Sequence, residues 1–527
     1  MPVLEDGEPP PRGLGSIALT SRYPHLDSSG LRTRTPSPEP WTPRDEEEEA
    51  ELLSRGATPR RRQQRLRDRW ITVLGFKLPL PLFVMFLLPP VLVALTFLFH
   101  FPSSLPHGDS LSLLSNGTHE FHATTILLSI DGFRPDYLEH GDLVPNILSM
   151  GREGLRAKSM EPIFPTLTFP NHWAMLTGLH AESHGIVAND FWAPDVQGEF
   201  SSRNKSSWNP LWWWGEPVWS VAERGGRRSA QMMWPGPPTT AAGIAPSFFI
   251  EFKHTAPLDK LPELLSYFDK PIDAAPTLIL SYLPDIDVAG HAGGPVSTDV
   301  EDALRRVDGF VGALRAALLQ RNLSDIVDLV VVSDHGMAAT SVERLIFLDD
   351  LLGEGFNDLE YRDGWPSLGL RFRDQSPVDK YLEVLRTASE NGSFSVYTHD
   401  TMLERWHFNH GARVAPIYLV PELGWVITDH DELDKNSHKG VMDIKGAHGY
   451  DNTHPEMQAV FFAQGPWAER VKAAAGTHED MWETVQPPVL KPFRNLELFN
   501  LIMRLQRLER IAPPNNGTDG FWERLVD

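Results

Sequence analysis

Four short apolar runs along the chain predict strands that are buried on both faces. They cover Thr124–Ile130, Thr277–Leu283, Asp328–Ser333 and Gln458–Ala463. Continuous runs of this length, without polar alternation, are typical of a largely parallel sheet. Apolar positions three or four residues apart predict helices from Val300 to Leu318 and from Leu496 to Leu505. The pattern therefore predicts an α/β domain with a mostly parallel central sheet flanked by helices.

A longer apolar run precedes this domain. Residues 78–99 contain no charged side chain, and this length is close to the ~20 residues that span a bilayer. Six arginines between positions 60 and 69 come directly before it, which predicts a cytoplasmic N-terminus and a single-pass type II topology. Prolines at 79, 81, 89 and 90 predict a kinked transmembrane helix, and a buried helix of a soluble protein is the alternative.

Charge divides the chain into regions with different expected roles. The net charge of -22 is the sum of -5 over residues 1–59, +6 over 60–77 and -23 over the remainder. The first region is rich in Pro, Ser and Gly, and we expect a disordered cytoplasmic tail. The predicted order is then a basic juxtamembrane segment (60–77), a transmembrane helix (78–100), a stalk (101–120), a folded domain (121–518) and a C-terminal tail (519–527).

Composition also excludes several functions. The chain has no cysteine, which excludes disulfides, iron–sulfur clusters and thiol nucleophiles. Its acidity argues against a stable nucleic-acid partner. N-glycosylation motifs occur only after the apolar run, and this predicts a glycosylated extracellular or lumenal domain, at the cell surface or in a vacuole-like compartment. The acceptor asparagines are Asn116, Asn204, Asn322, Asn391 and Asn516.

Carboxylates and imidazoles gather where the predicted strands end. In open α/β sheets ligands bind beyond the carboxyl ends of the strands. Carboxylate and neutral imidazole ligands suit zinc and similar divalent ions, and two such ions can stabilise an in-line displacement at phosphorus. Any one of these residues alone is more often a helix cap or a turn residue. The candidates are Asp131, Asp287 with His291, Asp334 with His335, and His448.

A candidate nucleophile is Thr168, two residues before Pro170. Proline favours the first turn of a helix, so the threonine is expected at a helix N-terminus, where the dipole and a metal ion would favour its alkoxide. From local sequence alone, an N-cap is the alternative.

An ordered series of motifs resembles the nucleotide pyrophosphatase/phosphodiesterase family of the alkaline phosphatase superfamily. It comprises Thr168-Phe-Pro-Asn-His172, Thr177-Gly-Leu179, Glu182-Ser-His-Gly185, Gly215-Glu-Pro-Val-Trp219, Trp234-Pro-Gly236, Asp287-x-x-Gly-His291, Ser333-Asp-His-Gly-Met337, His448-Gly-Tyr-Asp-Asn452 and Pro513-Pro-Asn-Asn-Gly-Thr518. The resemblance covers about residues 122–518, so it implies that 121–518 is an alkaline-phosphatase-like phosphodiesterase domain.

The resemblance also implies residue roles. One zinc ion would be held by Asp131, Thr168, Asp334 and His335, and a second by Asp287, His291 and His448. Thr168 would form a covalent nucleotidyl intermediate, Asn189 would hydrogen-bond a phosphoryl oxygen, and Phe169 would stack on a nucleotide base.

The resulting hypothesis is a membrane-anchored two-zinc phosphodiesterase that releases a nucleoside 5′-monophosphate from nucleoside triphosphates or dinucleotides. One alternative is an enzyme that cleaves lipid or choline-phosphate esters. Another is an inactive, glycosylated surface-binding protein, which would be expected to have lost ligand residues. Tryptophans that could contact a substrate are more often part of a core; they are Trp208, Trp212, Trp213, Trp214 and Trp219.

Overall fold

The computed structural model describes residues 70–73, 76–79, 108–435, 437–438, 441–442 and 445–526, which fall in two compact units divided after Leu105. In the first unit Trp70–Val73 (β1) and Phe76–Pro79 (β2) form an antiparallel hairpin. The expected transmembrane helix is therefore wrong at residues 78 and 79, since Pro79 has no amide hydrogen and is compatible with an edge strand. Residues 80–100 of that helix, and the expected tail over 1–59, lie outside the described residues. None of the helices that the structure describes is long and apolar enough to cross a bilayer.

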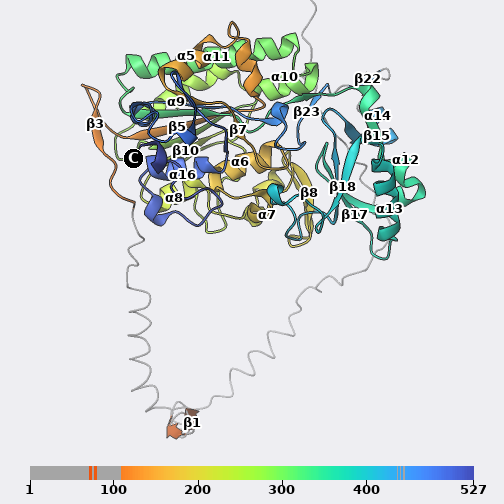
Figure 1. Cartoon of the computed structure of the whole chain (residues 1–527). Helices are drawn as coiled ribbons and strands as arrows, with labels where there is room; N and C mark the ends of the chain where they lie inside the picture. The colour runs from red at the N-terminus through yellow and green to blue at the C-terminus, as the bar shows by residue number, and fades with distance from the viewer. Residues whose placement is uncertain are drawn as a thin grey trace, which may run out of the picture. The chain divides into compact units, whose positions relative to one another are not determined.

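The described part of the second unit is built on a nine-stranded sheet (Figure 1). Its strands, in spatial order, are β11 (Phe248–Ile250), β10 (Ser229–Met232), β12 (Leu278–Leu283), β5 (Thr124–Ile130), β13 (Val327–Val332), β24 (Phe461–Gln464), β6 (Leu155–Ala157), β26 (Pro488–Leu490) and β25 (Trp482–Val485). From β11 to β13 all neighbours are parallel. β24 is antiparallel to both β13 and β6, so the sheet as a whole is mixed. The α/β prediction is confirmed, whereas the expected parallel direction is wrong for the run near Gln458–Ala463.

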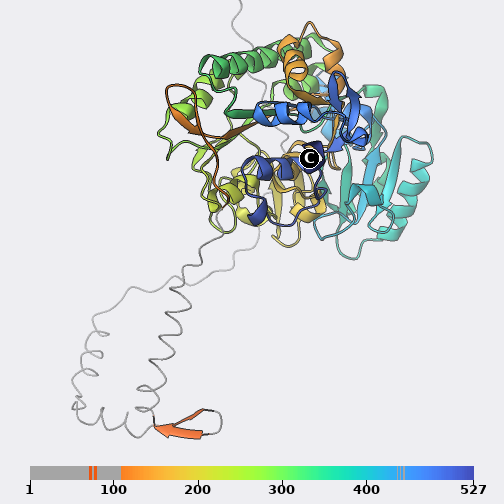
Figure 2. The same ribbon diagram turned by 60° about the vertical axis from the view of Figure 1, so that its left-hand side comes forward.

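Both faces of the central strands are buried, in two separate cores. Leu127, Leu280 and Val330 face one core, while Ile126 and Leu329 face the other. This alternation explains why β5 reads as a continuous apolar run, because neither face meets water. The first core is covered by α6 (Thr168–Thr177), α8 (Val218–Arg224), α15 (Pro466–Ala473) and α16 (Glu497–Leu505), and the second by α5 (Pro145–Glu153), α10 (Asp285–Gly293) and α11 (Thr298–Gln320) (Figure 2).

A smaller sheet lies beside the main one. Its antiparallel order is β16 (Leu359–Asp363), β17 (Leu368–Phe372), β19 (Ile417–Pro421) and β18 (Phe394–Thr398), and it packs with α12 (Leu348–Leu352) and α13 (Val378–Ser389) around a third core. The hairpin of β8 (Asp190–Ala193) and β9 (Gly198–Ser201) joins it to the main sheet, because Trp192 stacks on Tyr361 with ring centroids 4.1 Å apart. The sequence had indicated only loops and extra elements in this part of the chain.

The remaining elements are short. They are β3 (Leu113–Ser115), β4 (Glu120–His122), β7 (Met160–Glu161), α7 (Ala181–His184), α9 (Leu261–Ser266), β14 (Ala338–Ala339), β15 (Leu345–Phe347), β20 (Val426–Thr428), α14 (His430–Lys435), β21 (Ser437–His438), β22 (Val441–Met442), β23 (Gly446–Ala447) and β27 (Phe493–Arg494). β3 and β4 pair within the expected stalk. Trp522 and Leu525, in the expected C-terminal tail, are buried in the first core, so this segment packs against the domain.

Candidate metal and catalytic centre

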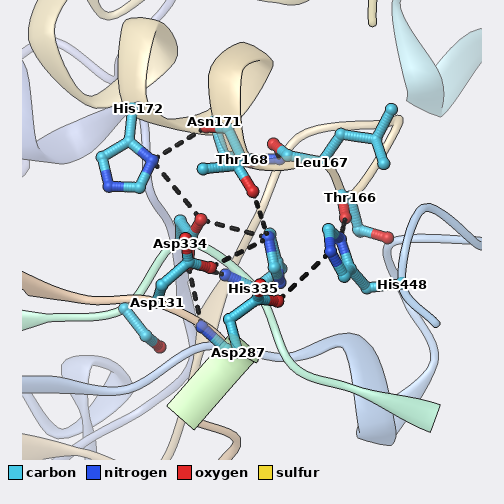
Figure 3. Close-up of polar contacts among 12 residues, drawn as sticks. Asp131, Thr166, Leu167, Thr168, Asn171, His172, Asp287, Asp334, His335 and His448 are labelled. Atoms are coloured by element: carbon cyan, nitrogen blue, oxygen red, sulfur yellow. Dashed lines mark hydrogen bonds and ion pairs between the residues drawn. The ribbon is translucent and has the colours of Figure 1, made fainter. Parts of the chain in front are cut away.

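The predicted ligand residues meet at the carboxyl edge of the parallel strands (Figure 3). Asp131 follows β5, and Asp334 and His335 follow β13. Asp287 and His291 lie on α10, one helical turn apart, immediately after β12. His448 follows β23, which pairs with β14 just beyond β13. Adjacent parallel strands thus bring together side chains that are up to 317 positions apart in the chain.

The first group surrounds the Nε2 atom of His335. This nitrogen lies 3.4 Å from Asp131 Oδ1, 3.1 Å from Asp334 Oδ2 and 3.2 Å from Thr168 Oγ1. All of these side chains are buried. The geometry places the candidate nucleophile beside the candidate ligands.

The second group surrounds Asp287. Its Oδ1 atom lies 3.3 Å from His448 Nε2 and 3.5 Å from His291 Nε2, and the two imidazole nitrogens are 3.1 Å apart. The His335 ring stacks on the His448 ring with centroids 3.6 Å apart, so the two groups are adjacent. His335 also lies close to Asp287 and His448, and this double proximity was not evident from the sequence.

The backbone fixes the tautomer of each histidine. The Nδ1 atoms of His335, His448 and His291 lie 2.8–2.9 Å from the carbonyl oxygens of Gly336, Thr166 and Gly446, respectively. A carbonyl oxygen can only accept, so each Nδ1 carries the hydrogen and each Nε2 presents a lone pair. Three unprotonated nitrogens therefore face the carboxylates, as is usual for metal-bound histidines.

The carboxylates are likewise arranged with one oxygen directed at the centre. Within the described residues, Asp131 Oδ1, Asp287 Oδ1 and Asp334 Oδ2 are buried and accept no hydrogen bond. The opposite oxygen of Asp334 accepts from the backbone amides of Gly132 and His335. Lone pairs on oxygen and nitrogen thus face one another without protons between them.

The electrostatics reflect this crowding. Burial, followed by the charges of Asp334 and Asp287, raises the pKa of Asp131 well above its usual value. Burial also raises the pKa of Asp334, to about 8. For Asp287 burial acts in the same direction, but the neighbouring His291 and His448 outweigh it and hold the pKa below its usual range. A bound cation would relieve the repulsion among these three carboxylates.

The segment before Thr168 is held by Asn171. The Asn171 Nδ2 atom donates to the carbonyls of Pro165 (3.1 Å) and Leu167 (2.9 Å), and its Oδ1 accepts from the amide of Ile163 (2.8 Å). α6 begins at Thr168, and the cap position belongs to Leu167. The Thr168 hydroxyl is therefore directed at His335, and the N-cap alternative is not the arrangement observed.

Asn189 and Phe169 lie next to the nucleophile. Asn189 Oδ1 accepts a hydrogen bond from the Phe169 amide at 3.0 Å. This leaves the Asn189 amide hydrogens available to a ligand. The half-buried Phe169 ring lies 6.0 Å from Phe200 and 6.2 Å from Trp213, centroid to centroid. Of the five tryptophans considered above, Trp212, Trp213 and Trp219 are buried in the first core, and Trp214 is the most exposed at 37%.

Two residues that contact the centre were missed by sequence reasoning. The Tyr282 hydroxyl donates to Asp131 Oδ2, and His172 Nδ1 lies 3.3 Å from Asp334 Oδ2. The available signals were the position of Tyr282 near the end of β12 and the spacing of His172 one helical turn after Thr168. Neither signal identifies the partner.

The glycosylation motifs are at the surface. Asn204, Asn322, Asn391 and Asn516 are exposed and Asn116 is half-buried. Asn116 Nδ2 donates to the carbonyl of Arg321 at 2.8 Å, so this amide already has a partner.

A third group of possible ligands lies in the smaller lobe. Asp349, Asp350 and His430 approach one another, and His430 Nδ1 lies 2.8 Å from Asp349 Oδ2. The His430 ring stacks on Phe347 and is 55% exposed, unlike the histidines of the main centre.

The geometry can be compared with known proteins. A family profile described as type I phosphodiesterase/nucleotide pyrophosphatase matches residues 125–451. A protein of Schizosaccharomyces pombe named as an uncharacterized pyrophosphatase/phosphodiesterase is 36% identical over 420 residues, 77% of this chain and 80% of its own. Human ectonucleotide pyrophosphatase/phosphodiesterase family member 1 is 34% identical over 76% of this chain, and venom phosphodiesterase 2 of Crotalus adamanteus is 32% identical over 76%. The chain spans 42% of the human protein and 47% of the venom protein.

Solved structures match as well. Murine ectonucleotide pyrophosphatase/phosphodiesterase 5 has 28% identity and a TM-score of 0.66, covering 76% of this chain and 98% of the murine chain. An inactive threonine-to-alanine form of the same murine protein, solved in complex with AMP, has 27% identity and a TM-score of 0.66 over 77% of this chain and all of the murine chain.

Proposed function

The chain belongs to the type I phosphodiesterase/nucleotide pyrophosphatase family, hydrolases of phosphodiester and pyrophosphate bonds, and we propose that it is a two-zinc enzyme releasing nucleoside 5′-monophosphates. Its substrates would be nucleoside triphosphates, dinucleotides or related diesters. The observation that carries the proposal is the position of the Thr168 hydroxyl, 3.2 Å from His335 Nε2 and beside two groups of metal-ligand side chains.

The residues present fit a pair of zinc ions. Asp131, Thr168, Asp334 and His335 would hold one ion, and Asp287, His291 and His448 the other. The facing oxygens and nitrogens are 3.1–3.5 Å apart. Ligand atoms about 2.0–2.1 Å from a tetrahedral zinc ion are themselves ~3.4 Å apart, so the observed spacing suits this metal. When bound, the ions would stabilise charge on the attacking and leaving oxygens of an in-line displacement.

Thr168 is proposed as the nucleophile. Its hydroxyl is at the N-terminus of α6, whose dipole favours an alkoxide. The Thr168 oxygen forms a bond to phosphorus, and the bond from phosphorus to the leaving-group oxygen breaks, giving a nucleotidyl-threonine. Attack of water on the same phosphorus then releases the nucleoside monophosphate and restores the hydroxyl.

Asn189 and Phe169 are proposed to orient the substrate. The free amide hydrogens of Asn189 would donate to a non-bridging phosphoryl oxygen, an interaction that strengthens as charge develops there. Phe169 would stack on the base, because its ring is half-buried and braced by Phe200 and Trp213. The AMP bound to the murine relative supports a nucleoside monophosphate as product.

The membrane anchor remains part of the proposal. Residues 78–100 would form the transmembrane helix of a type II protein, with residues 1–77 in the cytoplasm and 101–527 outside it, occupied glycosylation motifs included. Glycosidase digestion of the membrane-extracted protein tests this topology, and unchanged electrophoretic mobility would contradict it.

The catalytic proposal is tested with the purified chain, zinc, and a panel of diesters that contrasts ATP and a dinucleotide with a choline-phosphate ester. We expect release of nucleoside 5′-monophosphate that depends on Thr168. A preference for the choline-phosphate ester would favour the alternative substrate class, and absence of turnover of every diester would overturn the proposal.

A further inference from the structure

His172 is a fully buried histidine at the centre that the proposed mechanism does not use. Its Nε2 atom lies 2.9 Å from Ser129 Oγ on β5. Its Nδ1 atom lies 2.8 Å from the Thr168 carbonyl oxygen at the start of α6 and 3.3 Å from Asp334 Oδ2 after β13. One ring thus joins the strand, the nucleophile helix and a candidate metal ligand (Figure 3).

The chemistry of these neighbours fixes the proton on the ring. Both atoms near Nδ1 are acceptors, so Nδ1 must carry the hydrogen. The ring is packed edge-on against Trp234 and Tyr282, with centroids 5.0 and 5.1 Å away. Burial in this environment lowers the pKa of His172 to about 3, which keeps the ring neutral. The second nitrogen, Nε2, therefore has a lone pair, and the Ser129 hydroxyl must donate to it.

His172 differs in this respect from His335, His448 and His291. All four rings place Nδ1 against a backbone carbonyl. In the other three the lone pair on Nε2 faces carboxylates, whereas in His172 it is already occupied by Ser129. His172 is therefore unsuited to bind metal through Nε2.

We propose that Ser129 and His172 form a positioning pair, in which the Ser129 hydroxyl selects the tautomer and the His172 Nδ1–H orients the Asp334 carboxylate relative to Thr168. This inference rests on the proposed function. Without the Ser129 donor, the other tautomer would place a nitrogen lone pair against the Thr168 carbonyl and Asp334 Oδ2, and the repulsion would separate the nucleophile helix from the ligand.

Two isosteric replacements separate positioning from packing. Asparagine carries its amide nitrogen near the place of Nδ1, so His172→Asn can still donate toward Thr168 and Asp334. Glutamine carries its amide near the place of Nε2, so His172→Gln keeps a partner for Ser129 and loses the donor toward Asp334. A role in packing alone predicts no selective advantage of asparagine, the smaller replacement.

The experiment uses the full chain and measures kcat and KM for a nucleotide diester, the zinc retained after gel filtration, and Tm. We expect His172→Gln to lower kcat ~10–100-fold with reduced zinc retention and little change in KM, as for other partners of metal ligands. His172→Asn should remain within ~5-fold of the parent kcat, and Ser129→Ala should fall between the two. The matched control is His184→Gln, a substitution of another buried histidine that has no described contact with the centre, and it should change Tm without changing kcat.

The inference is overturned if the two His172 variants lose kcat and zinc equally, or if neither variant changes. Either result in a parent protein that turns over diesters refutes the positioning pair alone. A parent protein without turnover refutes the proposed function instead.

Discussion

Two groups of two aspartates and a histidine occur in the second unit, and their surroundings differ. Asp131, Asp334 and His335 are buried at the edge of the main sheet, with carboxylate oxygens that accept no hydrogen bond. Asp349, Asp350 and His430 lie in the smaller lobe, where His430 pairs directly with Asp349 and both Asp350 and His430 are exposed.

The comparison shows that ligand type alone does not define a metal site. In the surface group the imidazole Nδ1 lies against a carboxylate, so a proton shared between them neutralises the charge. In the buried group Nδ1 is used by a backbone carbonyl, and the lone pair on Nε2 faces further lone pairs. Only this second arrangement requires a cation, and the four predictions that follow test that distinction.

The largest expected effect follows removal of the nucleophile. Thr168→Ala should lower kcat ~10⁴-fold, because loss of a nucleophile removes the covalent route. Thr168→Ser retains a hydroxyl and serves as the control. Steady-state assays of a nucleotide diester measure both variants, and an alanine variant with near-parental kcat would refute the covalent route.

Asp334→Asn and Asp349→Asn test the two groups directly. We expect Asp334→Asn to lower kcat/KM more than ~100-fold and to reduce bound zinc, since altering even an indirect partner of a ligand costs ~10–100-fold. Asp349→Asn should change neither quantity. Metal analysis and kinetics of both proteins check this, and equal losses would abolish the distinction between the groups.

Metal removal should reveal the same distinction in stability. Chelation should lower Tm by about 5 °C, because a ligand present at ~1,000 times its Kd contributes about 4 kcal/mol to folding. In the metal-free state Asp334→Asn should have a Tm equal to or above that of the parent, since the substitution removes a carboxylate whose pKa is raised by burial. A lower Tm of the metal-free variant would contradict the repulsion inferred here.

The smallest expected effect concerns His430. The Asp349 carboxylate raises the pKa of His430 above its ordinary value. A raised pKa means that the stabilisation is fully present below the pKa of the unfolded chain and is lost as pH rises through the folded pKa. Asp349→Asn should return the His430 pKa to its ordinary range, as measured by histidine hydrogen–deuterium exchange and mass spectrometry. An unchanged pKa would show that the pair is not formed in solution.

The strands that carry the centre could be predicted because their sequences are dictated by burial on both faces. The bounds of β5 coincide with the predicted Thr124–Ile130, which places Asp131 at the sheet edge. The direction of β24 could not be predicted, because a short apolar run is the same in a parallel and an antiparallel neighbour. The lobe around β16–β19 was missed because its short antiparallel strands alternate and are interrupted by turns.

The candidate centre was predictable by residue but not by contact. The resemblance indicated which aspartates and histidines to consider, and the structure brings all of them together. It did not indicate Tyr282 beside Asp131 or Ser129 beside His172, pairs separated by 151 and 43 positions. Such pairs depend on how strands and helices cross in space, which spacing along the chain does not encode.

The hydrogen bonds of Asn171 also bear on the temperature dependence of the reaction. They fix the backbone before Thr168 at Ile163, Pro165 and Leu167, independently of any substrate. The conformational entropy of this segment is therefore lost once, during folding, and not again in each catalytic cycle. The activation free energy for attack by Thr168 should then be mainly enthalpic, so that kcat rises steeply with temperature for as long as the domain stays folded.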